Sequence, residues 1–212
     1  MEEKTTLADL ARLLIDLPHG RRRIVALVGA PGSGKSHVAD DLVARINAAQ
    51  PGRAAVLPMD GYHYDDTLLA ALGRLPRKGA PDTFDVGGLA AMLDRLGAGD
   101  EEAVAVPVFD RAIEIARAGA RLIPKSAEVI VVEGNYLLLD DAPWDALGAR
   151  FDLTVRLDVP QEVLRARLTA RWEGFGLSPE AVRVKLEEVD LPNGRRVLEN
   201  SRPAHFRLTN AG

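Results

Sequence analysis

The stretch Gly29-Ala30-Pro31-Gly32-Ser33-Gly34-Lys35-Ser36 follows the pattern G-x-x-x-x-G-K-S. Glycine lets a backbone turn tightly, so that its N–H groups can point at the oxygens of a phosphate group. Lys35 offers a positive charge to the outer phosphates, and the hydroxyl of Ser36 is a ligand of the kind that Mg²⁺ binds. The stretch therefore predicts a phosphate-binding loop, or P-loop, that holds a nucleotide.

The residues on either side give this loop the context that it requires. Residues 24–28, Ile-Val-Ala-Leu-Val, are typical of a short buried strand, and residues 37–49 favour a helix. The positive end of that helix would face the bound phosphates. An ordinary strand-to-helix turn is the weaker alternative. The predicted nucleotide-binding residues are Gly29, Ala30, Pro31, Gly32, Ser33, Gly34, Lys35, Ser36 and His37.

Composition limits the class of protein. A chain of 212 residues can bury a sizeable core, and we expect a single domain with a lid over residues 1–212. The net charge of −4 gives no electrostatic basis for binding nucleic acid or an anionic membrane. No cysteine is present, which excludes disulfides and thiolate chemistry. Because neither a signal peptide nor an apolar run of ~20 residues is found, we expect a cytoplasmic enzyme without membrane insertion. A homodimer is compatible with the sequence, although no pattern marks an interface.

A second predicted strand, residues 54–59, ends in acidic and aromatic residues: Asp60-Gly61-Tyr62-His63-Tyr64-Asp65-Asp66. Ligands of open α/β sheets bind beyond the carboxyl ends of the strands. Asp60 at this position could accept the proton of a substrate hydroxyl, which is the role of a base in phosphoryl transfer. The alternative for Asp60 is an Asx turn with Gly61. Asp65 and Asp66 are better explained as caps of a following helix.

Residues 128–134, Glu-Val-Ile-Val-Val-Glu-Gly, favour a strand that is buried on both faces. A carboxylate at its exit, Glu133, is costly unless it is solvated or bound to something. In P-loop proteins this position commonly supplies the acid near Mg²⁺. We therefore predict that Ser36 and Glu133, with Asp60 through water, bind Mg²⁺. A solvated charge at the strand end is the alternative for Glu133.

Arginines follow the next predicted strand, residues 151–159. Pro160 favours the start of a helix that carries Arg167 and Arg171 four residues apart, on one helical face. Glycines at 174 and 176 break this pattern, and Ser178-Pro179 restarts a helix. A lid near residues 167–180 is predicted, with arginines that stabilise charge on the transferred phosphoryl group. A solvated basic helix face is the alternative.

The remaining segments favour further elements. An amphipathic helix is predicted over residues 6–17 and another over 67–75, and Asp85 favours the start of a helix over 86–96. Residues 103–111 favour an extended segment. Residues 113–123 stay open between strand and helix, because Ile113-Glu114-Ile115 alternates while the alanines suit a helix. A short helix and a final strand are predicted within residues 193–208.

Taken in order, these motifs resemble the family of phosphoribulokinase, uridine kinase and bacterial pantothenate kinase. The resemblance covers nearly the whole chain, and it is strongest to small bacterial proteins named as fructose transport-system kinases or nucleoside/nucleotide kinase-like proteins. Trp172-Glu173 differs from uridine kinases, where an Arg-Asp pair is common. The motifs that carry it are Gly29–Ser36, Asp60-Gly61-Tyr62-His63, Lys78-Gly79-x-Pro81…Phe84-Asp85, Pro107-x-Phe109-Asp110, Glu133-Gly134 and Arg167/Arg171.

The resemblance implies a three-layer P-loop NTPase fold with a five-stranded parallel sheet, ATP with Mg²⁺, and a small-molecule hydroxyl acceptor. It also implies a substrate-binding insert near residues 61–127. The catalytic candidates are Asp60, Lys35, Arg167 and Arg171. The substrate-binding candidates are Tyr62, His63, Lys78, Asp85, Asp110, Arg111 and Tyr136.

Three functions are compatible with a P-loop. The first is a kinase that moves the γ-phosphoryl group of ATP to a hydroxyl of a sugar, a nucleoside or a pantothenate-like molecule. The second is a switch or motor that only hydrolyses nucleotide, but the chain lacks the Asn-Lys-x-Asp of GTPases and the Leu-Ser-Gly-Gly-Gln of transporter ATPases. The third is a nucleotide-binding regulator that would bind ATP but fail to turn over any acceptor. Asp60 in its aromatic setting favours the kinase.

Overall fold

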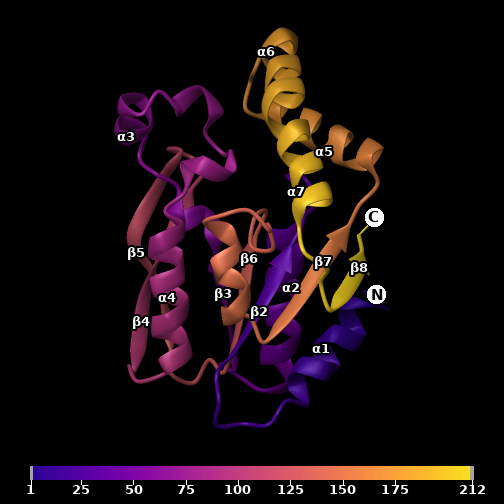
Figure 1. Ribbon diagram of the computed structural model, residues 1–212. Coiled ribbons are helices and arrows are strands. Elements are labelled where there is room, and N and C mark those ends of the chain that lie inside the picture. The colour runs from indigo at the N-terminus through magenta and orange to yellow at the C-terminus, as the bar shows by residue number, and fades with distance from the viewer. Residues whose placement is uncertain (1, 211–212) are drawn as a thin grey trace.

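A six-stranded, all-parallel sheet forms the middle layer of the computed structural model, which describes residues 2–210 (Figure 1). The predicted α/β fold is confirmed. The sixth strand adds to the five that the resemblance implied, and it is the three-residue β1 at the sheet edge, paired with β8. A segment this short carries no pattern of its own. In spatial order the strands are β1 (Glu3–Thr5), β8 (Phe206–Thr209), β7 (Leu153–Asp158), β2 (Arg23–Val28), β6 (Val129–Gly134) and β3 (Ala54–Pro58).

The central strands are buried on both faces, as their β-branched runs predict. In β6, Ile130 and Val132 join one hydrophobic cluster, and Val129 and Val131 join another on the opposite face. Helices α1 (Leu7–Ile15) and α2 (Lys35–Ala49) contribute to the second cluster, and α4 (Val86–Ala98) contributes to the first. Thr6 caps α1 by accepting the N–H of Asp9 at 3.1 Å, so the helix begins where the sequence predicts.

A separate antiparallel hairpin lies beside the sheet, formed by β4 (Ala103–Asp110) and β5 (Ile115–Pro124) (Figure 1). Residues 113–123, which the sequence left open between strand and helix, therefore form a strand over Ile115–Pro124. Pairing with β4 gives their backbone groups hydrogen-bond partners that a local sequence pattern does not reveal. The hairpin register shifts opposite Pro107, which has no N–H to donate, and Gly119 there has a φ of 62°. Between β3 and β4 lie the short α3 (Asp66–Ala71) and three 3₁₀ turns (Met59–Tyr62, Leu75–Arg77 and Pro81–Thr83).

The segment after β7 is helical and stands above the carboxyl ends of the strands (Figure 1). It contains α5 (Gln161–Gly174), α6 (Pro179–Val184), a π-helical turn (Lys185–Asp190) and α7 (Leu191–Asn200). A helix, a break and a second helix stand where the lid is predicted. A further 3₁₀ turn, Trp144–Arg150, packs near α4. In the part of the chain described, no helix is long and apolar enough to cross a membrane.

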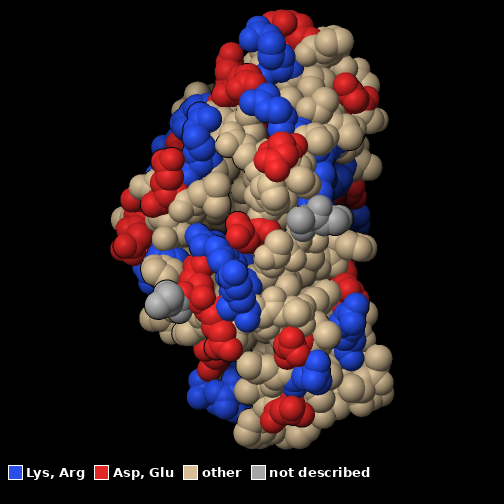
Figure 2. Space-filling view, turned by 90° about the vertical axis from the view of Figure 1, so that its right-hand side faces the viewer, with Lys and Arg blue, Asp and Glu red and all other residues tan. Residues whose placement is uncertain are grey.

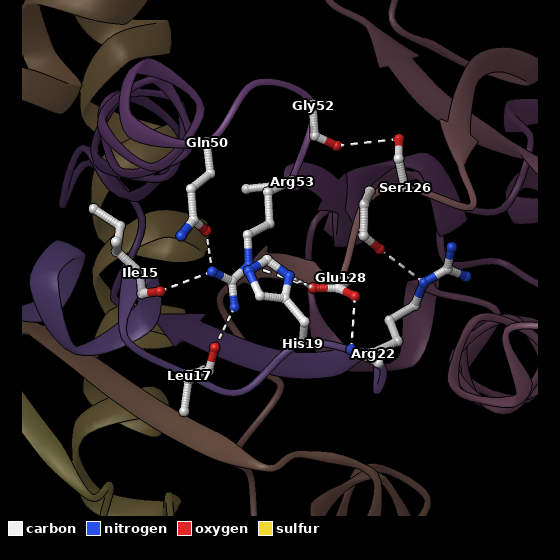
Figure 3. A network of polar contacts seen from close by, with 12 residues as sticks. Ile15, Leu17, His19, Arg22, Gln50, Gly52, Arg53, Ser126 and Glu128 are labelled. Atoms are coloured by element: carbon white, nitrogen blue, oxygen red, sulfur yellow. Dashed lines mark hydrogen bonds and ion pairs between the residues drawn. The ribbon is translucent and has the colours of Figure 1, made fainter.

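At the end of the sheet where the strands begin, a buried guanidinium group connects neighbouring elements (Figure 3). Arg53, 4% exposed, donates to the carbonyls of Ile15 and Leu17 at the end of α1, and it pairs with Glu128 at 3.5 Å. Glu128 also accepts the backbone N–H of Gly20 at 2.8 Å. These contacts connect α1 to the start of β3 and to the residue before β6, at the end of the sheet opposite the P-loop.

Candidate active site

Three neighbouring strands bring the P-loop, Asp60 and Glu133 to one edge of the sheet. In the ladder, Val28 at the end of β2 lies opposite Gly134 of β6, and Pro58 at the end of β3 lies opposite Glu133. The P-loop follows β2, and Asp60 follows β3 by two residues. The P-loop, Glu133 and Asp60 therefore meet beyond the carboxyl ends of parallel strands, where such sheets bind ligands.

The P-loop has the backbone that its glycines predict. Gly32 and Gly34 have φ values of 79° and 81°, in the left-handed region that favours glycine. No side chain caps the start of α2, so its first N–H groups remain available to an anion. The carbonyl of Ser33 accepts hydrogen bonds from Asn210 at 2.8 Å and from Arg167 at 3.2 Å. Two distant segments thus hold the loop.

Close backbone contacts position the turn that carries Asp60. A Cβ atom on Gly61 would lie 2.5 Å from the carbonyl oxygen of Pro107, and one on Gly134 would lie 2.5 Å from Cβ of Met59. Both distances are shorter than real Cβ contacts allow. Glycine at these positions lets the turn press against β4 on one side and β6 on the other.

Ser36 and Glu133 form the candidate metal site. The Ser36 hydroxyl donates to Oε1 of Glu133 at 3.1 Å, and Glu133 is 4% exposed. Burial raises the pKa of Glu133, against the opposing charge of Lys35. Within residues 2–210, no three acidic or histidine side chains form a metal site by themselves. A buried carboxylate and a hydroxyl suit Mg²⁺ that takes its other ligands from phosphate and water, so these residues fit the predicted ion.

Lys35 and Asp60 share this charged centre. Burial lowers the pKa of Lys35, while the carboxylates of Glu133 and Asp60 act to raise it. Burial alone would raise the pKa of Asp60, but His63 when it is protonated, and the positive charges of Arg111 and Lys35, outweigh it and lower that pKa. Asp60 is ion-paired with Arg111. Asp60 is therefore an ionised hydrogen-bond acceptor at neutral pH.

A cavity of ≈ 370 Å³ joins the P-loop to the region beyond Asp60. This volume is within the usual range for small-molecule sites. Helix α5 contributes Arg167 and Arg171. His63, which directly follows the 3₁₀ turn Met59–Tyr62, and Arg111, which lies between β4 and β5, also line the cavity. The residues predicted for nucleotide binding that line it are Pro31, Gly32, Gly34, Lys35, Ser36 and His37.

The structure brings only part of the predicted substrate-binding set to this cavity. His63, Lys78 and Arg111 line it. The other four do not line it, and their side chains contact neighbouring segments instead. Tyr62 is 7% exposed in the core, and Asp85 caps α4 by accepting the N–H of Gly88 at 2.8 Å. Asp110 forms an ion pair with Arg117 at 3.0 Å. The hydroxyl of Tyr136 donates to the carbonyl of Gly79 at 2.6 Å.

Sequence reasoning missed other polar and charged cavity residues, among them Asn135, Asp190 and Asn193, and also Glu114 and Lys185. Asn135 directly follows Glu133-Gly134 at the carboxyl end of a buried strand, and this position could have identified it as a residue near the ligand. Asp190 and Asn193 had no such signal, because they come from a helical segment whose path over the sheet is set by tertiary packing. Asp190 accepts the indole N–H of Trp172 at 2.7 Å.

Comparisons with known proteins place this site in a family, although no family model matches the chain. A crystal structure described as a "putative fructose transport system kinase" from Silicibacter sp. TM1040 has a TM-score of 0.88 and 43% identity, covering 97% of this chain and 99% of that one. The "Putative uridine kinase C227.14" of Schizosaccharomyces pombe is 31% identical over 169 residues, which are 76% of this chain and 71% of that protein. The chain belongs to the P-loop kinases.

Two further relatives of this kinase are an uncharacterized protein and a kinase of the family that the motifs resemble. Uncharacterized protein YggC of Escherichia coli (strain K12) is 36% identical over 188 residues, 88% of this chain and 77% of that protein. A pantothenate kinase of Sorangium cellulosum is 33% identical over 168 residues, 74% of this chain but only 54% of the longer relative. The predicted enzyme class, an ATP-dependent phosphotransferase with an alcohol group as acceptor, is confirmed at this level.

Proposed function

We propose that this kinase transfers the γ-phosphoryl group of ATP to a hydroxyl of a sugar, a nucleoside or a pantothenate-like small molecule. The observation that carries the proposal is the position of Asp60. Its ionised carboxylate lines the same cavity as the P-loop, and the cavity continues past it to side chains that a nucleotide phosphate does not need. The names of the uridine kinase-like and fructose kinase-like relatives support a hydroxyl acceptor of this size.

Each residue has a role that follows from its place. Lys35 and the N–H groups at the start of α2 would hold the phosphates. Ser36 and Glu133, with Asp60 through water, would hold Mg²⁺, which when bound neutralises charge on the phosphates. Asp60 would accept a hydrogen bond from the acceptor hydroxyl and then its proton.

Arg167 and Arg171 would act on the transferred group from above. Both line the cavity from α5, on the side opposite the sheet edge. Arginine forms directed hydrogen bonds with phosphate oxygens, so these residues can stabilise the charge that spreads over the phosphoryl oxygens during transfer. Catalysis would rest on positioning and charge stabilisation rather than on covalent chemistry with the protein.

The test is ADP release from Mg-ATP by the purified protein, with fructose, other sugars, nucleosides and pantothenate offered as acceptors. We expect one class to stimulate release. Lys35→Ala should abolish it, and Asp60→Asn should lower kcat by roughly 10²–10⁴-fold. Asp65→Asn is the matched control, because Asp65 is an exposed cap of α3 in the same loop. Acceptor-independent hydrolysis that is equal in wild type and Asp60→Asn would favour the nucleotide-binding regulator instead.

A further inference from the structure

The tip of the β4–β5 hairpin, residues 111–114, reaches the cavity with two side chains. Arg111 and Glu114 both line the cavity wall. Arg111 donates to Oδ2 of Asp60 and forms an ion pair with it. A carboxylate has a second oxygen with its own acceptor positions, so Oδ1 of Asp60 can accept the hydroxyl of an acceptor molecule. Arg111 can keep the carboxylate in one orientation only if the tip that carries it is itself fixed.

The backbone of Glu114 shows that this tip needs support. Glu114 has a φ of 55°, and within residues 2–210 it is the one non-glycine residue in the left-handed region. This region is unfavourable for a residue with a long side chain, and such a conformation persists only where surrounding contacts determine it. One contact is internal to the hairpin, because Asp110 accepts the N–H of Ala112 at 3.0 Å.

Lys78 supports the tip from outside the hairpin. Its Nζ donates to the carbonyl of Glu114 at 2.6 Å and to the carboxylate of Asp66 at 2.5 Å. Asp66 is the first residue of α3, so the ammonium group bridges α3 and the hairpin tip, which lie side by side (Figure 1). The side chain of Lys78 is only 15% exposed. Two of its three N–H donors are therefore already used by the protein itself.

The ring of Phe109 connects Lys78 to the base. It lies 5.3 Å from Nζ of Lys78 and 5.2 Å from Cζ of Arg111, distances at which a cation is attracted to an aromatic ring. The ring of His63 also packs against it, with centroids 4.7 Å apart, and Nδ1 of His63 donates to the carbonyl of Asp60 at 2.8 Å. The positions of the two cations and of Asp60 are thus coupled through one buried ring.

We propose that Lys78 is a positioning residue that fixes the hairpin tip against α3 and thereby holds Arg111 on Asp60. The inference rests on the proposed kinase function, because it concerns the orientation of the base in that reaction. Arg111 occupies one oxygen of Asp60, so that the other faces the acceptor hydroxyl. A mobile tip would release Arg111, and Asp60 would spend less time in the orientation that accepts the proton. Lys78 then acts through Arg111, without contact to the acceptor.

The first experiment measures the tip without any substrate, by amide hydrogen exchange over residues 110–115 of the full-length protein. In Lys78→Met we expect exchange there to be roughly tenfold faster or more, because opening of the tip costs less free energy. Lys78→Arg keeps a cation with N–H donors and should restore most of the protection. Lys125→Met is the matched control, because exposed Lys125 pairs with Glu102 at the other end of the same hairpin. Unchanged exchange at the tip in Lys78→Met would overturn the inference, with or without kinase activity.

The second experiment is a double-mutant cycle with an acceptor that stimulates ADP release. Lys78→Met and Arg111→Met should each lower kcat by roughly 10–100-fold, with the KM of ATP unchanged. The double variant should lose no more than the larger single loss, because one residue acts through the other. Losses that multiply, or an effect of Lys78→Met confined to the KM of the acceptor, would show direct contact with the acceptor and overturn the inference. Lys78-dependent exchange in a protein that no acceptor stimulates would uphold the fixed tip and count against the kinase proposal.

The third experiment changes the backbone at Glu114. Glu114→Asn and Glu114→Val both remove the carboxylate, but Asn adopts the left-handed region far more readily than a β-branched residue does. We expect faster tip exchange in the Val variant and a kcat roughly tenfold below that of the Asn variant. Equal exchange and equal kcat in the two variants would show that the tip conformation does not position the base, and would overturn the inference.

Discussion

At the scale of single residues, the carboxylate of Asp190 is expected to cost stability. Burial raises its pKa from the unfolded value of 3.8, although the Trp172 hydrogen bond and the charge of Arg171 oppose this. The folded state therefore binds this proton more tightly than the unfolded state. Its contribution to stability falls as pH rises from about 3.8 through the higher folded pKa, and the full penalty is present above it.

Asp190→Asn should thus be more stable than wild type at pH 7, which thermal unfolding measures as a higher Tm. Below the unfolded pKa the two proteins should converge. An Asn variant that is less stable than wild type at pH 7 would show that the paired carboxylate stabilises the fold.

Gly61 carries a prediction about geometry. In Gly61→Ala the new Cβ would overlap the Pro107 carbonyl, so the turn must move and Asp60 moves with it. A misplacement of about 1 Å can cost on the order of 10² in rate, so kcat should fall by roughly 10–100-fold. Gly97→Ala is the control, because its Cβ would meet only the Ile24 side chain at 3.8 Å, within α4. Unchanged kcat in Gly61→Ala would show that this contact does not position Asp60.

At the scale of elements, Arg53 connects α1, the start of β3 and Glu128 (Figure 3). Arg53→Met would leave two partly buried carbonyls without this donor and remove a buried cation from Glu128, so we expect a loss of about 2–4 kcal/mol in the free energy of unfolding. Urea denaturation measures this as a lower midpoint with an unchanged slope. Arg12→Met, which removes an ion pair with an arginine side chain 73% exposed, should cost less than about 1 kcal/mol. A change in the KM of ATP in Arg53→Met would contradict the separation of this network from the P-loop.

The elements also show how far sequence reasoning reaches. β2 and β6 were predictable because strands buried on both faces leave continuous apolar runs, and the P-loop and Asp60 could be placed because they follow strand ends. Residues 113–123 stayed open because only pairing with β4 makes them a strand. A local sequence pattern does not predict which side chain of a turn faces a cavity. The hydroxyl of Tyr136 contacts Gly79, while Asn135 beside it lines the cavity.

Asp190 shows a different limit of prediction from the sequence. Its position depends on the path from α5 through α6 and the π-helical turn, and on packing over the sheet edge. No short-range pattern encodes this path. The sequence could therefore place the P-loop, Glu133 and Asp60, which follow strand ends, far better than the cavity residues that come from segments far apart in the chain.

At the scale of the whole molecule, charge is spread rather than concentrated. On the face shown in Figure 2, Lys and Arg side chains alternate with Asp and Glu. With a net charge of −4, this face offers no extended basic surface for a polyanion. The cations that matter for a phosphate ligand are those that line the cavity, from the P-loop, the hairpin side and α5.

This arrangement predicts that MgATP draws the α5 arginines toward the P-loop, and the two tryptophans can report the movement. Trp172 lies in α5, and Trp144 is 2% exposed in the core, where it donates to the Pro81 carbonyl at 3.1 Å. Nucleotide binding should change the emission of Trp172, because its contacts with Asp190 and Lys185 depend on how α5 packs on the π-helical turn. The change should persist in Trp144→Phe, and it should be lost in Trp172→Phe and in Lys35→Ala. An equal response in Trp172→Phe would place the movement in the core instead, and the segment above the sheet would then be a fixed wall of the cavity rather than a lid.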